Sequence, residues 1–494
     1  MKYISTRDIS RCPEKVFAAE AIKKGLAPDR GLYMPEEIPA LTEKDIEKLR
    51  TLPYEERAAE ILSLFLTDYD KEKLLCDCRE AYSDERFPGG AAPLKDIGGS
   101  RFSLELWHGP TCAFKDMALQ IMPRLLSSAL EMTGEKRRAH ILVATSGDTG
   151  KAALEGYRDV PGVDITVFFP NDGVSRMQKL QMTTQKGENV NVAAVFGNFD
   201  DAQNGVKAIF ADKALAEKAE EKGFFFSSAN SINWGRLAPQ IVYYISAYCD
   251  LITAGKISNG DKINVCVPTG NFGNIFAAYI AKQMGLPLKR LICASNANCV
   301  LTDFIRTGTY DRKREFFKTM SPSMDILISS NLERLLFLIA GPEKAAAYMN
   351  ELSENGSYTV SEDVLKKIGE TFSGFYCPEE KTARVIKETF EKYGYLADTH
   401  TAVAIGCLDE YRQATGDSTV TVIASTASPY KFASDVCASL GSPADSDDPA
   451  EILRQLETVS GTASPKPLSA TLTLPVRFTN TIKPENMADF IFNN

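Results

Sequence analysis

Lys115 is the residue of this sequence with the clearest potential for covalent chemistry. It follows Phe114 and opens a run in which Met117, Ile121 and Leu125 share one stripe of a predicted helix. Burial among such neighbours disfavours the ammonium form, lowers the pKa of the amine and favours its attack on a carbonyl. Lysines are rarely buried, so a solvated lysine before a helix is the simpler interpretation of this residue alone.

A glycine-rich turn offers a second element of chemistry. It follows a strand pattern, precedes a helix pattern and consists of Pro268, Thr269, Gly270, Asn271, Phe272, Gly273 and Asn274. Its glycines allow a tight turn in which several N–H groups face one concavity, and the helix adds its positive end, so the turn suits a phosphate. It lacks the lysine of GxxxxGK[ST] and a full GxGxxG, which disfavours a Walker-type ATP site and weakens a dinucleotide site. A plain strand-to-helix turn is the alternative.

Two more polar loops follow strand patterns. Residues 146–150 read Ser-Gly-Asp-Thr-Gly, in which Ser146 and Thr149 suit a carboxylate or phosphate, while Asp148 could cap the helix or contact an amine or hydroxyl. A well-capped helix explains this loop equally well. Residues 425–429 read Ser-Thr-Ala-Ser-Pro. Ligands of open α/β sheets bind at the carboxyl ends of strands, so these loops and Lys115 could meet in one crevice suited to Schiff-base chemistry on a phosphorylated aldehyde.

Composition excludes several functions. The 494 residues include 44% hydrophobic and 24% charged residues and carry a net charge of −9, which is typical of a globular protein of several domains and argues against a nucleic-acid binder. No signal core or apolar run of membrane-spanning length occurs, and the 11 cysteines show no repeated CxxC, so we expect a cytoplasmic protein without membrane association. Three histidines without HxxxH or HExxH predict no metal site, and His400 is interpreted as structural rather than catalytic.

Strands and helices alternate through most of the chain. Strands are predicted at 140–144, 163–169, 190–196, 224–226, 262–267 and 419–424, with helices between them that include one long helix at 201–222. Such alternation predicts parallel sheets with crossover helices, which place the polar loops at one edge of each sheet. The predicted fold is α/β.

Residues 1–93 are predicted to form a helical N-terminal domain that ends at a Pro/Gly-rich linker. Residues 94–133 and 231–494 are assigned to a large domain with a helix-rich insertion at about 300–395, and residues 134–230 to a small α/β domain. No internal repeat is present.

The sequence resembles fold type II pyridoxal-phosphate enzymes of the tryptophan-synthase-β type, and within them the longer form of the threonine synthase family. The resemblance covers nearly the whole chain, with matching segments at 3–7, 31–35, 114–116, 146–150, 270–274, 321–326 and 425–432. It implies two open, mostly parallel, doubly wound sheet domains plus a helical N-terminal domain. It also implies a cytoplasmic monomer that acts on a small molecule.

Site roles follow from the same resemblance. Pyridoxal 5′-phosphate would be carried by Lys115, its phosphate would be held by Gly270, Asn271, Phe272, Gly273 and Asn274, and Thr426 would face the pyridine nitrogen. The implied substrate is O-phospho-L-homoserine, which reacts with water to give L-threonine and phosphate by γ-elimination and β-addition. The candidates for substrate contacts are Ser146, Asp148, Thr149, Asn233 and Arg236.

The sequence also contains one departure from the family pattern and leaves three competing functions open. Relatives often have histidine where this chain has Ser428, which could alter the lining of the site. A serine/threonine dehydratase or cysteine synthase shares the lysine and loops but does not explain the match at both termini. The second competing function is that of a non-catalytic pyridoxal-phosphate-binding homologue, and the third is phosphate binding without pyridoxal.

Overall fold

The fold contains two separate, largely parallel sheets, which a computed structural model describes for residues 1–145, 147–171 and 174–493. The larger sheet has six strands in the order β13-β10-β9-β14-β4-β3, and every pair except β3–β4 is parallel. Its strands are β3 (Leu94–Asp96), β4 (Arg101–Glu105), β9 (Ile263–Pro268), β10 (Leu288–Ser295), β13 (Phe372–Tyr376) and β14 (Thr421–Ser425). These two sheets confirm the predicted α/β class.

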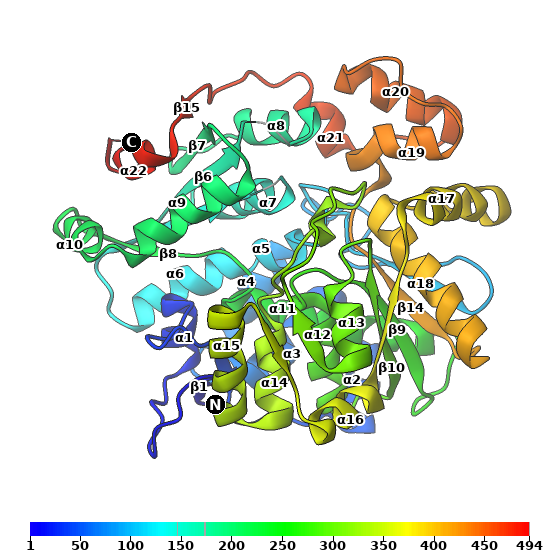
Figure 1. The fold of residues 1–494 in the computed structure, drawn as a ribbon, viewed down its shortest axis with the longest axis horizontal. Helices are drawn as coiled ribbons and strands as arrows, with labels where there is room; N and C mark the ends of the chain where they lie inside the picture. The colour runs from blue at the N-terminus through cyan, green and yellow to red at the C-terminus, as the bar shows by residue number, and fades with distance from the viewer. Residues whose placement is uncertain (146, 172–173, 494) are drawn as a thin grey trace.

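The central strands of the large sheet are covered on both faces. All residues of β9 and β14 are buried, as expected of parallel strands between two helical layers. Helices α12 (Gly273–Gln283) and α18 (Thr399–Thr415) pack against these strands, and α11 (Trp234–Thr253) packs against α12 (Figure 1). Because β9 and β14 are buried, the positions of their carboxyl ends, from which the polar loops emerge, are fixed.

The smaller sheet has five parallel strands in the order β15-β7-β6-β5-β8. These are β5 (Arg138–Ala144), β6 (Val163–Pro170), β7 (Val190–Val195), β8 (Phe224–Ser227) and β15 (Thr481–Ile482), joined by α7 (Asp148–Tyr157), α8 (Arg176–Thr183), α9 (Phe199–Ala211) and α10 (Lys213–Glu221). The single helix predicted at 201–222 is wrong. Asp212 ends α9 and caps α10 by accepting from Ala214 N and Leu215 N.

The C-terminal residues lie with the small sheet rather than with the large domain to which they were assigned. Strand β15 pairs with the edge strand β7, and α22 (Met487–Asn493) packs against α9 (Figure 1). Backbone N–H groups of Ala194 and Phe196 donate to the carbonyls of Asn480 and Ile482, at 2.9 Å each. The segment thus covers a sheet edge, a role that leaves almost no periodic pattern in the sequence.

The N-terminal region forms a helical layer with one small two-stranded antiparallel sheet. It contains β1 (Tyr3–Ser5), α1 (Ala18–Lys24), β2 (Tyr33–Pro35), α2 (Glu43–Arg50), α3 (Tyr54–Phe65) and α4 (Lys71–Ala81). The Trp234 ring of α11 lies 5.6 Å from the rings of both Tyr3 and Phe65, so the layer packs directly on the large domain.

The region predicted as an insertion at about 300–395 is helix-rich but also supplies sheet strand β13. Its other elements are α13 (Val300–Thr307), β11 (Thr309–Asp311), η1 (Pro322–Met324), α14 (Leu332–Ala340), α15 (Pro342–Asn355), β12 (Ser357–Thr359), α16 (Glu362–Thr371) and α17 (Glu379–Tyr393). The remaining elements are α5 (Asp116–Leu119), α6 (Met122–Met132), η2 (Pro429–Phe432), α19 (Ala433–Ser439), α20 (Pro449–Ser460), α21 (Lys466–Thr471) and η3 (Pro484–Asn486). Within the described ranges, no helix has the length and apolar character needed to span a bilayer.

Arg334, on α14, joins the N-terminal layer to the loops of the large domain. Its fully buried guanidinium donates to the carbonyls of Ile232 (2.6 Å), Ser231 (3.1 Å) and Tyr33 (3.3 Å), and to Asn331 Oδ1. The preceding Glu333 accepts from Arg7 at 2.7 Å. Two successive residues therefore attach the same helix to the N-terminal region.

Arg334→Met should lower the free energy of unfolding by about 3 kcal/mol, because several buried acceptors lose their donor. Urea unfolding followed by tryptophan fluorescence measures this, since the Trp234 ring lies 5.9 Å from the guanidinium carbon. Arg384→Met is the matched control: its side chain is 63% exposed, so a change within about 0.5 kcal/mol is expected. Equal stability of the two variants would contradict the role given to Arg334.

Candidate active site

Lys115 lies at the amino end of α5, where strand β14 and the following loop fix the backbone. Leu106 N donates to Ser425 O at 3.0 Å, and Phe114 N donates to Thr426 O at 2.8 Å. The lysine is 8% exposed. The predicted helix at this point is interrupted, because α5 ends at Leu119 and α6 begins at Met122.

The Lys115 amine has only distant polar partners in the described part of the chain. Its Nζ lies 3.5 Å from Ser323 Oγ and 3.8 Å from the nearer oxygen of Asp148, and 5.0 Å from the Phe114 ring centre. Burial lowers the pKa of Lys115 to about 8; Asp148 opposes this change, and Arg236 and Lys431 reinforce it. The amine is thus held close to the state in which it is nucleophilic at neutral pH.

Asp148, in the first turn of α7, is held between two lysines. Its Oδ1 lies 2.8 Å from Lys431 Nζ and accepts from Gln178 Nε2 at 2.9 Å, while Oδ2 faces Lys115. Burial alone would raise its pKa, but the two lysines hold the pKa of Asp148 well below its usual range. Asp148 is therefore a carboxylate engaged with two lysine amines, in line with the expected contact to an amine, and its contact with the substrate stays a prediction.

A second buried carboxylate fixes the loop before Lys115. Asp116 accepts from Thr111 N at 2.8 Å and from Thr111 Oγ1 at 2.7 Å. Burial raises the pKa of Asp116 to about 6, although these hydrogen bonds oppose the rise. A Cβ added to Gly109 would lie 2.5 Å from Asp116 Oδ2, so this approach requires glycine. These contacts hold the loop that precedes Lys115 in a compact conformation.

The glycine-rich turn adopts the compact form expected of a phosphate cradle. Phe272 has φ 62°, a left-handed conformation, and α12 begins at the next residue. A Cβ on Gly270 would lie 2.8 Å from Ser323 O, so the turn packs against the Ser323 segment. Asn331 holds the turn from outside by donating to Asn271 O from its backbone N (3.1 Å) and Nδ2 (3.0 Å).

Asn274 shows that this turn has unused donor capacity. Its Oδ1 accepts from Tyr243 (2.7 Å) and Tyr244 (2.5 Å), which orients the amide. Its Nδ2 is buried and has no hydrogen-bond partner within the described ranges. A buried amide donor without a partner, beside a helix N-terminus, fits an anionic group of a bound cofactor.

Thr426 directly follows the last residue of β14 and is 6% exposed. The end of this strand contacts the loop that precedes Lys115. Ser428 is fully buried, donates from its backbone N to Cys112 O at 3.0 Å, and accepts from Tyr430 N at 3.3 Å. The serine at the position where relatives often have histidine thus belongs to a buried, hydrogen-bonded turn.

The structure separates the five candidates for substrate contacts. Thr149 lies half-buried in the first turn of α7, and Ser146 lies outside the described residues. Asn233 uses both amide atoms internally: Nδ2 donates to Ile22 O at 2.8 Å and Oδ1 accepts from Gly235 N at 2.9 Å. It caps α11 and attaches the N-terminal layer, so its predicted site contact is not supported.

Arg236 differs from the other buried candidates because its charge has no carboxylate partner in the described part of the chain. It is 5% exposed and donates from Nη1 to Ala229 O at 2.8 Å. Burial lowers the pKa of Arg236 to about 10, and no carboxylate of the described residues lies within ion-pair distance. A buried, unpaired guanidinium that acts electrostatically on Lys115 is suited to an anionic substrate group.

Sequence reasoning missed the positions of Ser323, Lys431 and His400 around the site. His400 Nε2 accepts from Ser323 N at 3.1 Å, and its Nδ1 lies 2.9 Å from Asp398 Oδ1. His400 therefore supports the segment that faces Lys115, in agreement with its structural interpretation. The motif segments 321–326 and 425–432 contain Ser323 and Lys431, but only the fold shows that both approach the lysine.

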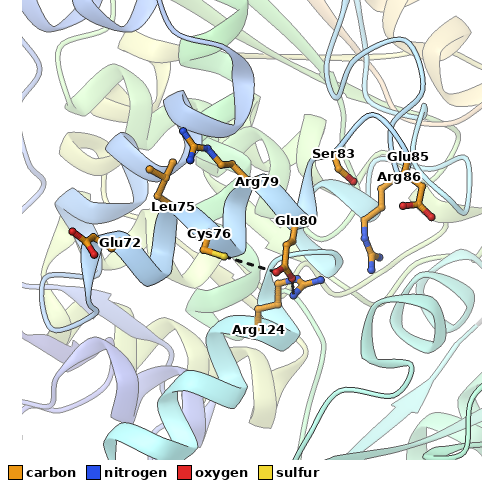
Figure 2. A pocket seen from close by; sticks show the side chains of 9 residues that line it. All are labelled: Glu72, Leu75, Cys76, Arg79, Glu80, Ser83, Glu85, Arg86 and Arg124. Atoms are coloured by element: carbon orange, nitrogen blue, oxygen red, sulfur yellow. Dashed lines mark hydrogen bonds and ion pairs between the residues drawn. The ribbon is translucent and has the colours of Figure 1, made fainter.

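A surface cavity lies away from Lys115. It has a volume of about 720 Å³ between α4 and α6 and is lined by Glu72, Leu75, Cys76, Arg79, Glu80, Ser83, Glu85, Arg86 and Arg124 (Figure 2). Its charged side chains partly pair with one another, as Arg124 does with Glu80. Across the described residues, no cluster of three potential metal ligands occurs.

The pKa of Lys115 predicts how fast the protein captures an aldehyde. Below about pH 8 the side chain is mainly ammonium and unreactive, and above it the free amine predominates. The rate at which the cofactor-free chain forms a borohydride-reducible adduct with pyridoxal phosphate should therefore rise with pH, with its midpoint near 8. A midpoint at the ordinary lysine value of about 10.4 would show that the amine is solvated.

Two protein-family models match the chain. "Threonine synthase N terminus" matches residues 2–82, and "Pyridoxal-phosphate dependent enzyme" matches residues 95–426. Human "Threonine synthase-like 1" is 41% identical over 449 residues, which span 87% of this chain but only 60% of that protein. "Threonine synthase" of Pseudomonas aeruginosa is 40% identical over 87% of this chain and 89% of its own length.

Solved structures agree with these matches over the full length. A pyridoxal-phosphate-bound threonine synthase from Brucella melitensis is 36% identical with a TM-score of 0.88, covering 100% of this chain and 99% of its own. Threonine synthase from yeast is 33% identical with a TM-score of 0.88, covering 100% and 97%. In sequence and in fold, this chain belongs to the threonine synthase family of pyridoxal-phosphate dependent enzymes.

Proposed function

We propose that this protein is a threonine synthase that uses pyridoxal 5′-phosphate. It converts O-phospho-L-homoserine and water to L-threonine and phosphate by γ-elimination and β-addition of water. The observation that carries the proposal is the buried Lys115 amine, whose pKa is lowered to about 8, in a chain that matches threonine synthases along its length. The small-molecule substrate fits a site built from buried loops.

Three parts of the site are suited to the cofactor. Lys115 would bond to its aldehyde carbon. The turn from Gly270 to Asn274 would hold its phosphate through backbone N–H groups and the unpartnered Asn274 Nδ2. Thr426 would meet the ring nitrogen with a neutral hydroxyl. When bound, the cofactor supplies an electron sink for carbanions.

With cofactor and substrate bound, the Lys115 amine would also act as the general base. Its pKa near 8 lets the amine accept a proton from the substrate and return it at neutral pH. Ser323 Oγ at 3.5 Å and the Phe114 ring confine the amine on the protein side. Burial of the amine excludes bulk water from this proton transfer.

Arg236 is the residue that we propose for the substrate phosphate. Its buried guanidinium lacks an anionic partner among the described residues, and its charge reaches Lys115. Thr149, at the amino end of α7, suits the substrate carboxylate, and the sequence places Ser146 beside it. The two anionic ends of the substrate would then contact different domains.

The competing functions have less support. A dehydratase-like lyase needs the lysine and loops but not residues 2–82, which match the threonine synthase N-terminal model. A non-catalytic homologue has no need of a buried, unpaired Arg236. We also propose a cytoplasmic monomer, in line with 11 cysteines that are all free.

Lys115→Ala should abolish the visible band of the cofactor-bound protein and reduce phosphate release from O-phospho-L-homoserine by about 10³-fold or more. Absorbance before and after borohydride, followed by a phosphate-release assay, measures both effects. Lys207→Ala, an exposed change on α9, is the control and should retain both properties. Wild-type turnover by Lys115→Ala with added cofactor would refute the proposal.

Arg236→Leu should raise KM for O-phospho-L-homoserine roughly tenfold to a hundredfold, because a charge-assisted hydrogen bond to the substrate phosphate is lost. Arg236→Lys keeps the charge and should show a smaller rise. Steady-state phosphate release gives KM, and the cofactor absorption band, expected to be unchanged, reports an intact site. If KM stays constant in Arg236→Leu while the band persists, the substrate phosphate binds elsewhere.

A further inference from the structure

Lys431 is a buried cation to which the proposed reaction assigns no role. It belongs to η2 in the large domain and is 3% exposed. Its Nζ lies 2.8 Å from Asp148 Oδ1 and donates to Thr111 O at 2.9 Å. A lysine is kept at such depth only when its charge is fully engaged.

Asp148 reaches this lysine from the other domain. It lies on α7, beside the small sheet, whereas Lys431 and Lys115 both follow parts of the large sheet. Of its two oxygens, Oδ1 is bound by Lys431 and Gln178. Oδ2 remains 3.8 Å from Lys115, beyond the length of a hydrogen bond.

We propose that Lys431 is a positioning residue for Lys115: it engages the Asp148 carboxylate across the domain boundary and so keeps that carboxylate from forming a close ion pair with the reactive amine. The inference rests on the proposed function, in which the Lys115 amine must attack an aldehyde. Asp148 is accordingly a partner of Lys431 within the site rather than a substrate ligand.

The charges around Lys115 support this assignment. Asp148 on α7 and Asp116 on α5 favour its ammonium form, whereas Arg236 on α11 and Lys431 on η2 disfavour it. Asp148 is the strongest of the four, so whatever engages Asp148 has the largest control over the proton on Lys115. Without Lys431, only the Gln178 amide would hold Oδ1, and the carboxylate would be attracted to the remaining lysine, Lys115.

Lys431 also fixes the backbone on which Lys115 stands. The carbonyl of Thr111 accepts a hydrogen bond from Lys431. Thr111 in turn donates from its backbone N and its Oγ1 to Asp116, the neighbour of Lys115. One side chain therefore connects the Asp148 carboxylate of the small domain with the start of α5. The position of the carboxylate relative to the amine is set through this connection.

Two variants test the proposal because they should act in opposite directions. In Lys431→Met, the midpoint pH for capture of pyridoxal phosphate by the full chain should rise by about one unit, and the capture rate at neutral pH should fall roughly tenfold. In Asp148→Asn, the midpoint should fall below that of the wild type. A purely structural disturbance would change both variants in the same direction, so opposite shifts are the distinguishing result.

Further variants keep the test decisive. Lys431→Arg retains the charge and should restore the wild-type midpoint, and Asp148→Asn/Lys431→Met should fall below Lys431→Met. Lys151→Met is the matched control: it removes a partly buried lysine on α7, which is paired with Glu155 rather than with Asp148, and should leave the midpoint unchanged. If Lys431→Met does not fold, Asp148→Asn still gives the sign, because its midpoint should lie below that of the wild type.

The outcomes separate this inference from the proposed function. If the wild type never captures pyridoxal phosphate, the proposed function fails. If the wild type captures it with a midpoint near 8 but Lys431→Met and Asp148→Asn leave that midpoint in place or shift it the same way, the positioning role of Lys431 is overturned.

Discussion

The desolvation of one amine is the constraint on which the rest of this structure depends. Lys115 is removed from water at the end of a sheet, and no ion pair closer than 3.8 Å compensates its charge among the residues that the structure describes. Such a position is unfavourable for an ammonium group and therefore favours the neutral, nucleophilic form. The loop before it is held by Asp116 and Thr111, and the loop beside it by β14, so the unfavourable position cannot relax.

Buried polar groups without a full set of partners also occur where the site is proposed to bind anions. Asn274 presents a buried amide donor that the described protein does not satisfy, and Arg236 presents a buried guanidinium without a carboxylate partner among the described residues. Their cost is tolerated because the surrounding core is rigid: α11 carries Arg236 and the two tyrosines that orient Asn274. Binding of a cofactor and a substrate with anionic groups would satisfy these donors, which links occupancy of the site to stability of the fold.

The domains meet through buried polar contacts rather than through an apolar surface alone. Arg334 and Glu333 attach the N-terminal layer to the helix that supports the glycine-rich turn. Lys431 and Asp148 connect the large and small domains beside Lys115. Contacts of this kind are sensitive to small displacements, so the relative positions of the domains directly set the electrostatics of the amine.

Local patterns determined much of this protein. Alternating apolar runs predicted the α/β class and most strands, and glycine-rich loops after strands predicted the phosphate turn, because these features depend on neighbours a few residues apart. The prediction of a single helix at 201–222 failed because the amphipathic pattern continues through Asp212, although this aspartate ends one helix and caps the next. The assignment of the last residues to the large domain failed because β15, the strand that joins them to the small sheet, is only two residues long.

Long-range geometry decided the rest. Lys115, Asp148, Arg236, Ser323 and Lys431 are far apart in sequence, and each has an ordinary solvated interpretation when taken alone. Their mutual distances, and hence the pKa of the amine, depend on how two sheets and a helical layer pack together. The sequence by itself determined which residues had the required chemistry; only the tertiary structure decided which of them face one another, because electrostatic interactions depend on distance and burial rather than on order along the chain.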